Sequence, residues 1–265
     1  MASYNLLGRD VEEVCSPQVH ESFSRVDDIF YMPDLIRARI ATESAHRVWQ
    51  TWWTAPSLRA TGRTAAGTPV VLYAHVKNFY SDGNNIKKAI EEKKLVRGAG
   101  ILPREEFARL LSLEGNGVSV VDYVALKKST NGVIRVDEAL KHPQTLSFLG
   151  VSEEEAQALL RKHKSIYGAN IGIYHFDDLA NEPLARVLFL GVVNFNYYLN
   201  DNLDSDARVL GVRRRASVSE PVSAAGAPQK NFRVPTLEEV LSLGVNFVPN
   251  AARKQFETEV RALYK

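Results

Sequence analysis

Hydrophobic and polar positions follow their clearest pattern between residues 47 and 76. Residues 47–54 are rich in β-branched and aromatic side chains, and residues 58–64 alternate apolar and polar positions. A glycine-containing turn at 65–67 then leads into the strongly apolar run 68–76. This succession predicts an antiparallel meander of three strands, of which the last two form a β-hairpin.

Apolar residues at helical spacing predict several helices. The best marked begins at Ser152, because Ser152 and Glu155 have the form of a capping box and Gly168 stands just beyond the last turn. A short helix is also predicted at residues 10–14, with Asp10 as its N-cap. The remaining predicted helices cover residues 33–43, 86–94, 104–113 and 137–141.

Short apolar runs outside the meander predict further strands. The run Ile171 to His175 follows directly on the helix that Ser152 begins. The run 184–193 is apolar enough for a strand in the centre of a sheet. The other predicted strands cover residues 118–124, 133–136 and 209–212. A meander combined with helix–strand units predicts an α+β fold, with a mixed sheet and helices packed on it.

The distribution of residue types predicts three regions along the chain. Residues 1–213 form a single α+β domain, and residues 214–231 form a flexible linker, because Ser, Ala, Pro and Gly replace large apolar residues there. Residues 232–265 form a helical segment. Its amphipathic helix at 251–264 carries an apolar stripe of Phe256, Val260 and Leu263. Such a stripe needs a partner surface, either the domain itself or another copy in a homo-oligomer.

Composition places the chain among ordinary globular proteins. Of its 265 residues, 45% are hydrophobic and 24% are charged, and the net charge is only +2. This balance argues against nucleic acid or an anionic membrane as a partner. The N-terminus lacks the pattern of a signal peptide and the apolar runs are too short to span a bilayer, so we expect a soluble, cytoplasmic protein. A single cysteine, Cys15, excludes an intramolecular disulfide.

Three of the predicted strands end in titratable residues. His75, Asp122 and His175 close these strands, and Asp177 follows His175 by two positions. If the strands are neighbours that run in the same direction, the four side chains converge at one edge of the sheet. Imidazole with carboxylate suits a divalent metal, with His175 and Asp177 as ligands, or a general acid–base pair. An antiparallel neighbour would instead send one residue to the opposite edge.

Two other motifs resemble ion-binding loops but lack residues that such loops require. Asn202, Asp204 and Asp206 alternate as in a calcium loop, but Ala207 and Arg213 replace its glycine and its glutamate. We therefore expect a solvated turn. The loop that begins at Lys127 and Lys128 could hold a phosphate, but it lacks the glycine spacing of a P-loop, which favours an exposed turn.

Two functions are compatible with these residues. The first is a small hydrolase-type enzyme acting on a small molecule, with or without a divalent metal. In it, His175 is the ligand or base, Asp177 is a ligand or orients it, and His75 and Asp122 contribute. The alternative is a non-enzymatic interaction or assembly protein that uses the linker and the C-terminal helix to bind a partner or itself. No motif in the sequence decides between them.

Overall fold

The computed structural model describes residues 3–176, 178–191, 196–197, 202–213 and 261. The chain divides into two compact units, Met1–Arg215 and Ala216–Lys265, and the architecture below is that of the first. The predicted linker and C-terminal helix lie outside the described residues, apart from Arg261, and stay predictions. No helix in the described part of the chain is long and apolar enough to cross a bilayer.

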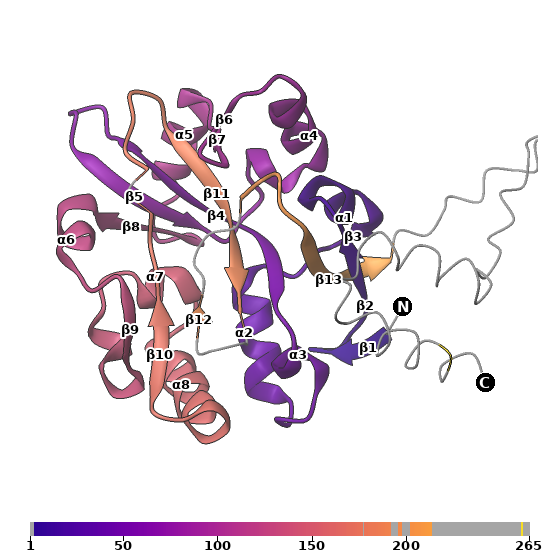
Figure 1. Cartoon of the computed structure of the whole chain (residues 1–265). Helices are drawn as coiled ribbons and strands as arrows, with labels where there is room; N and C mark the ends of the chain where they lie inside the picture. The colour runs from indigo at the N-terminus through magenta and orange to yellow at the C-terminus, as the bar shows by residue number, and fades with distance from the viewer. Residues whose placement is uncertain (1–2, 177, 192–195, 198–201, 214–260, 262–265) are drawn as a thin grey trace, which may run out of the picture. The chain divides into compact units, whose positions relative to one another are not determined.

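The centre of the first unit is a six-stranded sheet in the order β6-β7-β11-β4-β5-β8 (Figure 1). Its neighbouring strands are all antiparallel. The predicted hairpin is confirmed as β4 and β5, and the predicted central strand is confirmed as β11, which lies between β7 and β4. The strands are β4 (Trp53–Arg63), β5 (Pro69–Ala74), β6 (Leu95–Val96), β7 (Ala99–Ile101), β8 (Val118–Asp122) and β11 (Leu184–Leu190).

The predicted third strand of the meander is wrong. Residues Arg47–Gln50 form the short helix α3, and the strands on either side of the hairpin are β11 beside β4 and β8 beside β5. Helix α3 begins where the His46 ring accepts a hydrogen bond from the Val48 amide. Trp49 is fully buried and its indole N–H donates to the Arg39 carbonyl. Burial of this ring outweighs the β-propensity of the segment.

Two smaller sheets flank the central one. The first has the order β1-β2-β13-β3, and its β2 contains the residues predicted as a helix at 10–14, which instead pair with β1 and β13. The second has the order β12-β10-β9. Their strands are β1 (Ser3–Leu6), β2 (Arg9–Ser16), β3 (Val26–Asp27), β9 (Gly132–Arg135), β10 (Asn170–Ile173), β12 (Asn196–Tyr197) and β13 (Ala207–Arg213).

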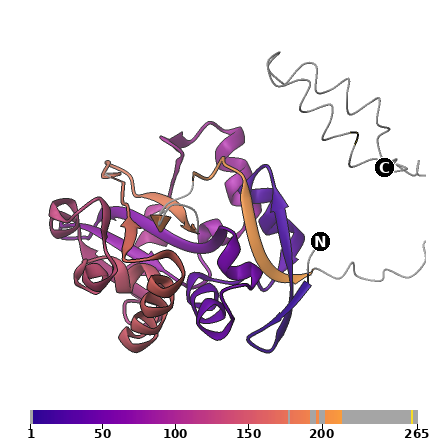
Figure 2. The same ribbon diagram turned by 60° about the horizontal axis from the view of Figure 1, so that its bottom comes forward.

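Helices cover both faces of the central sheet. Helices α2 and α8 lie side by side against one face, where Figure 2 shows them beneath the sheet. The predicted helix that Ser152 begins is confirmed as α8, with its capping box and with Gly168 at its end. The helices are α1 (Val19–Arg25), α2 (Met32–Ala41), α4 (Gly83–Glu91), α5 (Arg104–Leu111), α6 (Tyr123–Lys128), α7 (Thr145–Leu149) and α8 (Glu153–Tyr167), with 3-10 turns at Phe79–Ser81 and Val136–Lys141.

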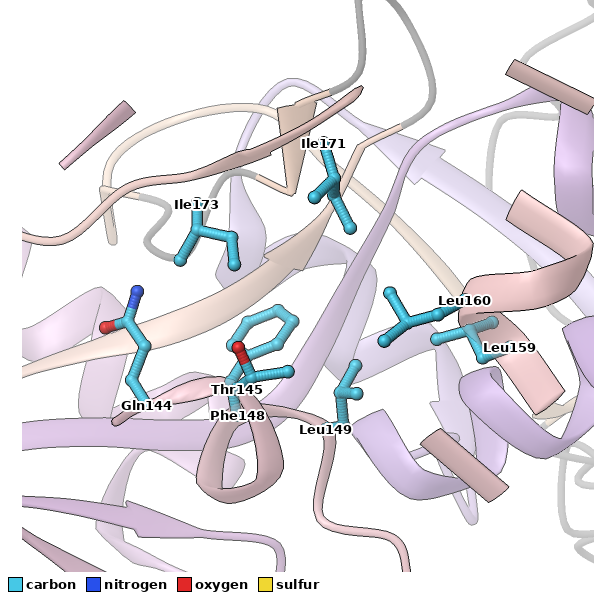
Figure 3. Close-up of a pocket in the computed structure, with 8 residues that line it drawn as sticks. All are labelled: Gln144, Thr145, Phe148, Leu149, Leu159, Leu160, Ile171 and Ile173. Carbon is cyan, nitrogen blue, oxygen red and sulfur yellow. The ribbon is translucent and has the colours of Figure 1, made fainter. Parts of the chain in front are cut away.

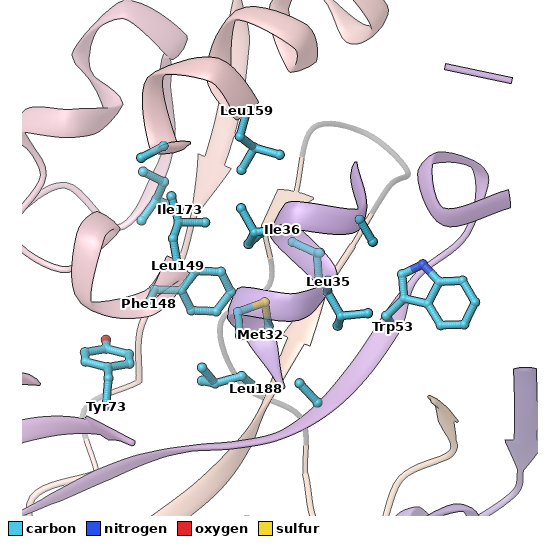
Figure 4. Close-up of a cluster of buried hydrophobic side chains, with 14 of the residues drawn as sticks. Met32, Leu35, Ile36, Trp53, Tyr73, Phe148, Leu149, Leu159, Ile173 and Leu188 are labelled. Carbon is cyan, nitrogen blue, oxygen red and sulfur yellow. The ribbon is translucent and has the colours of Figure 1, made fainter. Parts of the chain in front are cut away.

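The central sheet separates two hydrophobic cores. In the first, α2 inserts Leu35 and Ile36 between α7, α8 and the sheet residues Trp53 and Tyr73 (Figure 4). The second core lies on the other face, where α1, α4 and α5 cover it. Strand β4 is therefore buried along almost its whole length, which is typical of a strand covered on both faces. The predicted α+β class is confirmed.

Charged side chains are buried on the first face of the sheet. Arg59 of β4 and Arg186 of β11 are direct partners in the strand pairing, and each side chain is 1% exposed. Asp178 provides the counter-charge: Arg186 Nε donates to Asp178 Oδ2 at 2.8 Å, and Arg59 Nη1 lies 3.5 Å from the same oxygen. One carboxylate thus holds two buried arginines together.

His75, just beyond β5, joins this face of the sheet to α7. Its Nε2 donates to the Ser147 carbonyl at 2.8 Å, and its Nδ1 accepts from the Ser57 hydroxyl at 3.0 Å. Gly150 has φ of +66° and lies against the ring, where a Cβ would come within 2.4 Å. Burial lowers the pKa of His75 to about 4, because protonation would put a charge on a desolvated ring.

We expect Asp178→Asn to lower the free energy of unfolding by about 3–5 kcal/mol, because it removes the carboxylate that pairs with both buried arginines. Urea unfolding measures the change. Glu182→Gln is the matched control, since Glu182 pairs with Arg104 on the surface, where ion pairs contribute little. Equal effects of the two substitutions would contradict this role of Asp178.

We expect the His75 ring to stay neutral in the folded protein until the pH falls to about 4. The unfolded chain binds this proton near pH 6.5, so the stability that His75 contributes is complete above pH 6.5 and decreases as the pH falls toward 4. The loss is roughly 1–3 kcal/mol. A 1H–13C NMR titration of the ring measures the pKa, and a midpoint near 6.5 in the folded state would refute the assignment.

Candidate ligand-binding site

The structure separates His75 from Asp122. Strands β5 and β8 are antiparallel, so Asp122 pairs with Val70 at the start of β5, whereas His75 follows the end of that strand. Their predicted convergence is therefore wrong. Each side chain also has a structural role. The Asp122 carboxylate accepts a hydrogen bond from the Ala125 amide and caps α6, while His75 is bonded on both ring nitrogens.

His175 belongs to a different sheet, after the end of β10. Its ring lies 6.4 Å from that of His142, measured between centroids, and not beside His75, whose bonds are to Ser57 and Ser147. Asp177 lies outside the described residues. Within the part of the chain that the structure describes, no group of three or more His, Cys, Asp and Glu side chains could hold a metal ion. The three described residues of the predicted site, His75, Asp122 and His175, therefore do not gather at one edge of a sheet.

His175 instead lines a hollow beside the buried arginines. The hollow encloses about 210 Å³, including solvent at its mouth. Its walls come from β4, from α6 and from the segment that follows β10. The lining residues are Arg59, Tyr123, Leu126, Lys127, His175 and Phe176. Three distant parts of the sequence therefore build this one site.

Arg59 is the most deeply buried polar residue of the hollow. Its Nη2 donates to the Phe176 carbonyl at 2.8 Å, and its Nη1 faces Asp178. Its Nε is buried and has no hydrogen-bond partner among the described residues. Buried donors are normally paired, so this N–H is an exception among the described residues.

The rim of the hollow carries an exposed aromatic ring. Phe176 is 46% exposed, although large aromatic side chains are usually covered in a folded domain. The guanidinium of Arg186 lies over this ring, with its Cζ 4.3 Å from the centroid. Asp178 in turn fixes Arg186, so the buried ion group also supports the ring at the rim.

Side chains from elsewhere in the chain hold the backbone of residues 174–176. Gln144 donates to the Tyr174 carbonyl at 3.4 Å. Asn131 both accepts from the His175 amide at 3.1 Å and donates to its carbonyl at 3.0 Å. Arg59 donates to the Phe176 carbonyl. These bonds explain why β10 ends at Ile173 and not at His175 as predicted, since the next residues bond to side chains.

A second hollow, of about 300 Å³, lies between α7, α8 and β10 (Figure 3). Its walls are mainly core residues such as Phe148, Leu159 and Ile173. The one long polar side chain in it, Gln144, is fully buried and its amide is bonded to Tyr73 and Tyr174. A hollow without convergent polar groups suits core packing better than specific recognition.

One feature of the sequence is specific to this site. Arg59 and Arg186 interrupt two runs that read as buried strands. A charge in such a run requires a buried counter-charge elsewhere, because arginine is almost never fully buried without a partner. The partner is Asp178, and no local signal in the sequence identifies its pairing with the two arginines.

Comparison with known proteins gives one informative match. No protein-family model and no curated protein matches the sequence. Among solved structures, one is described as "Accommodation of massive sequence variation in Nanoarchaeota by the C-type lectin fold". It is 42% identical, superposes with a TM-score of 0.70, and the alignment covers 78% of this chain and 100% of that chain.

This match corrects the predicted function. The prediction of a hydrolase, with possible metal binding, is wrong, because a relative with a C-type lectin fold points to a binding role instead. The alternative prediction of a non-enzymatic interaction protein agrees better with the match. By its sequence identity over the full length of that relative, the chain belongs to the same family of C-type-lectin-fold proteins.

Proposed function

We propose that this chain is a non-catalytic recognition protein that binds its ligand in the hollow beside Arg59. The observation that carries the proposal is the kinship with a protein whose C-type lectin fold accommodates massive sequence variation. A fold of that kind needs a surface where side chains can change while the backbone stays in place. The hollow offers such a surface.

The proposal is supported by the different roles of two sets of residues around 174–176. We call Arg59, Asn131 and Gln144 the framework residues, because their side chains bond to the backbone of this segment. Replacing the side chains of His175 and Phe176 would leave those backbone bonds in place. Recognition would then depend on side chains that do not hold the backbone of the site.

The display side chains are a chemically mixed set. Lys127 is exposed and charged, His175 is half-buried, and Phe176 presents an exposed ring. A few convergent polar groups beside an aromatic surface are typical of small ligand sites. We call Lys127, His175 and Phe176 the display residues. Their chemistry sets which ligand the hollow accepts.

We expect the double substitution His175→Ser with Phe176→Ser to change the melting temperature by less than about 3 °C, because it removes the contact of Phe176 with Arg186 but leaves the hydrogen bonds to the backbone of residues 174–176 in place. Asn131→Ala should lower it by more, since two hydrogen bonds to the backbone of residue 175 are lost. Thermal unfolding followed by circular dichroism measures both. The reverse order would contradict the division into framework and display.

We expect small fragments to bind at the display residues. In 1H–15N NMR spectra of the full chain, a library of aromatic and polar fragments should shift the amides of residues 127, 175 and 176 most. The triple variant Lys127→Ala, His175→Ala, Phe176→Ala should lose these shifts. Val133→Ala, at an exposed apolar residue of β9 outside the hollow, is the matched control and should retain them.

Two results would count against recognition in this hollow. The first is a set of shifts concentrated at Leu159, Leu160 and Ile171, which line the apolar hollow instead. The second is chemical conversion of the bound fragments, which NMR spectra of the recovered fragments would reveal and which would indicate catalysis.

A further inference from the structure

Residues 174–176 are connected to the centre of the first unit through α7. Gln144 lies directly before α7, and its side chain donates to the Tyr174 carbonyl at 3.4 Å. Ser147 lies three positions later, within α7, and its carbonyl accepts a hydrogen bond from His75. Three positions are about one helical turn, so a shift of α7 at Ser147 also moves Gln144.

The contacts that hold α7 to the central sheet come from the end of β5. Tyr73 of β5 donates its hydroxyl to the Gln144 amide oxygen at 2.9 Å, and His75 follows β5 directly. Burial raises the pKa of Tyr73 above its ordinary value of 10, so this hydroxyl stays neutral at acid and neutral pH. Of these two contacts, only that of His75 can therefore change its charge as the medium becomes acid.

The hydrogen bonds of His75 fix its neutral form. The Ser147 carbonyl can only accept, so Nε2 carries the proton and Nδ1 accepts from the Ser57 hydroxyl. The same hydroxyl oxygen accepts from the Met32 amide at 2.8 Å. A second proton, on Nδ1, would face the Ser57 hydroxyl, which would then lose the acceptor of its own proton.

The groups that face the His75 ring are uncharged. They are the Ser57 hydroxyl of β4, the Ser147 carbonyl of α7 and the Gly150 backbone, which lies against the ring. Burial is the larger influence on the pKa of His75 and lowers it to about 4, whereas the bond to Ser147 raises it, and no charge among the described residues contributes. A proton on the ring is not compensated where the ring lies, which favours an arrangement in which the ring has left its place.

A second histidine contacts the start of α7. His142 Nδ1 accepts from the Gln144 amide at 3.5 Å, and its Nε2 donates to the Thr130 carbonyl at 2.8 Å. Its ring also faces that of His175, another titratable group, at 6.4 Å between centroids. Burial lowers the pKa of His142 as well. The titration of His142 therefore has to be followed separately from that of His75.

We propose that α7 is a pH-sensitive switch of the recognition site: protonation of His75 releases Ser147 and with it α7, and Gln144 then loses its hydrogen bond to Tyr174. This inference rests on the proposed function, under which residues 174–176 form part of the binding site. The neutral ring belongs to the closed arrangement. That arrangement is therefore complete above pH 6.5, the ordinary pKa of histidine, and is lost as the pH falls toward about 4.

NMR spectra of the full-length chain, recorded from neutral pH down to about pH 3.5, test the proposal without any ligand. 1H–13C spectra give the midpoint of each histidine ring, and HNCO spectra follow the carbonyl carbons of the two acceptors, Ser147 and Tyr174. We expect both carbonyls to shift with the midpoint of the His75 ring, while far-UV circular dichroism still shows the helix and strand content of neutral pH. Because no ligand is used, the result is independent of the fragment experiment that tests the proposed function.

His75→Gln removes the titrating group and keeps a donor in its place. The glutamine amide can donate to the Ser147 carbonyl, but it takes up no proton, so the shift of the Tyr174 carbonyl should be lost. His163→Gln is the matched control. His163 of α8 is also buried and has a pKa lowered to about 4, but it bonds to the Asn170 carbonyl. This control should move the midpoint at Tyr174 by less than about 0.3 pH units.

Ser57→Ala changes the surroundings of the ring without replacing it. It removes the hydroxyl that donates to Nδ1, so the neutral ring loses a stabilising bond and the midpoint of His75 should rise. The midpoint at the Tyr174 carbonyl should rise by the same amount, which a contact that only supports the fold would not produce.

Four results would overturn the proposal. A Tyr174 carbonyl that shifts identically in the wild type and in His75→Gln would show that another group responds to acid. A shift that follows the His142 ring would assign the response to that histidine. Equal effects of His75→Gln and His163→Gln would indicate general acid unfolding. A Ser147 carbonyl that shifts alone would show that α7 is released without an effect on the recognition site.

Discussion

The pairing of Arg59 with Arg186 across β4 and β11 is the constraint on which the site depends. Two like charges directly opposite each other in a sheet repel, and burial increases that repulsion. The two arginines can lie side by side here because the Asp178 carboxylate pairs with both of them. The carboxylate therefore ties the segment after β10 to the central sheet, and this segment forms one wall of the hollow.

The side chains that hold the backbone of the site are therefore different from the side chains that line it. The backbone of residues 174–176 is bonded by side chains from β4, from the loop before β9 and from the start of α7. The side chains of residues 175 and 176 are left to face the hollow. Such a separation would let the side chains of the site change without loss of its backbone bonds. It agrees with the likeness to a protein described as accommodating massive sequence variation by the C-type lectin fold.

Much of the fold could be predicted from local signals in the sequence. The capping box at Ser152 and the hairpin at residues 58–76 were found because their determinants lie within a few residues. Strand order was not accessible, and so the convergence of His75 with Asp122 failed on the direction of β8. Of the site, His175 was found from its place after a strand. Arg59 was missed because its role depends on Asp178, which is more than a hundred positions away in the chain.

Hydrogen exchange at the His175 amide tests the central claim most directly, because that N–H donates to the Asn131 side chain. The account predicts that protection of this amide is the same in the wild type and in a variant with serine at positions 175 and 176. It also predicts that protection is lost in Asn131→Ala. Loss of protection in the serine variant would show that the display side chains hold their own backbone, and the separation of framework from display would be wrong.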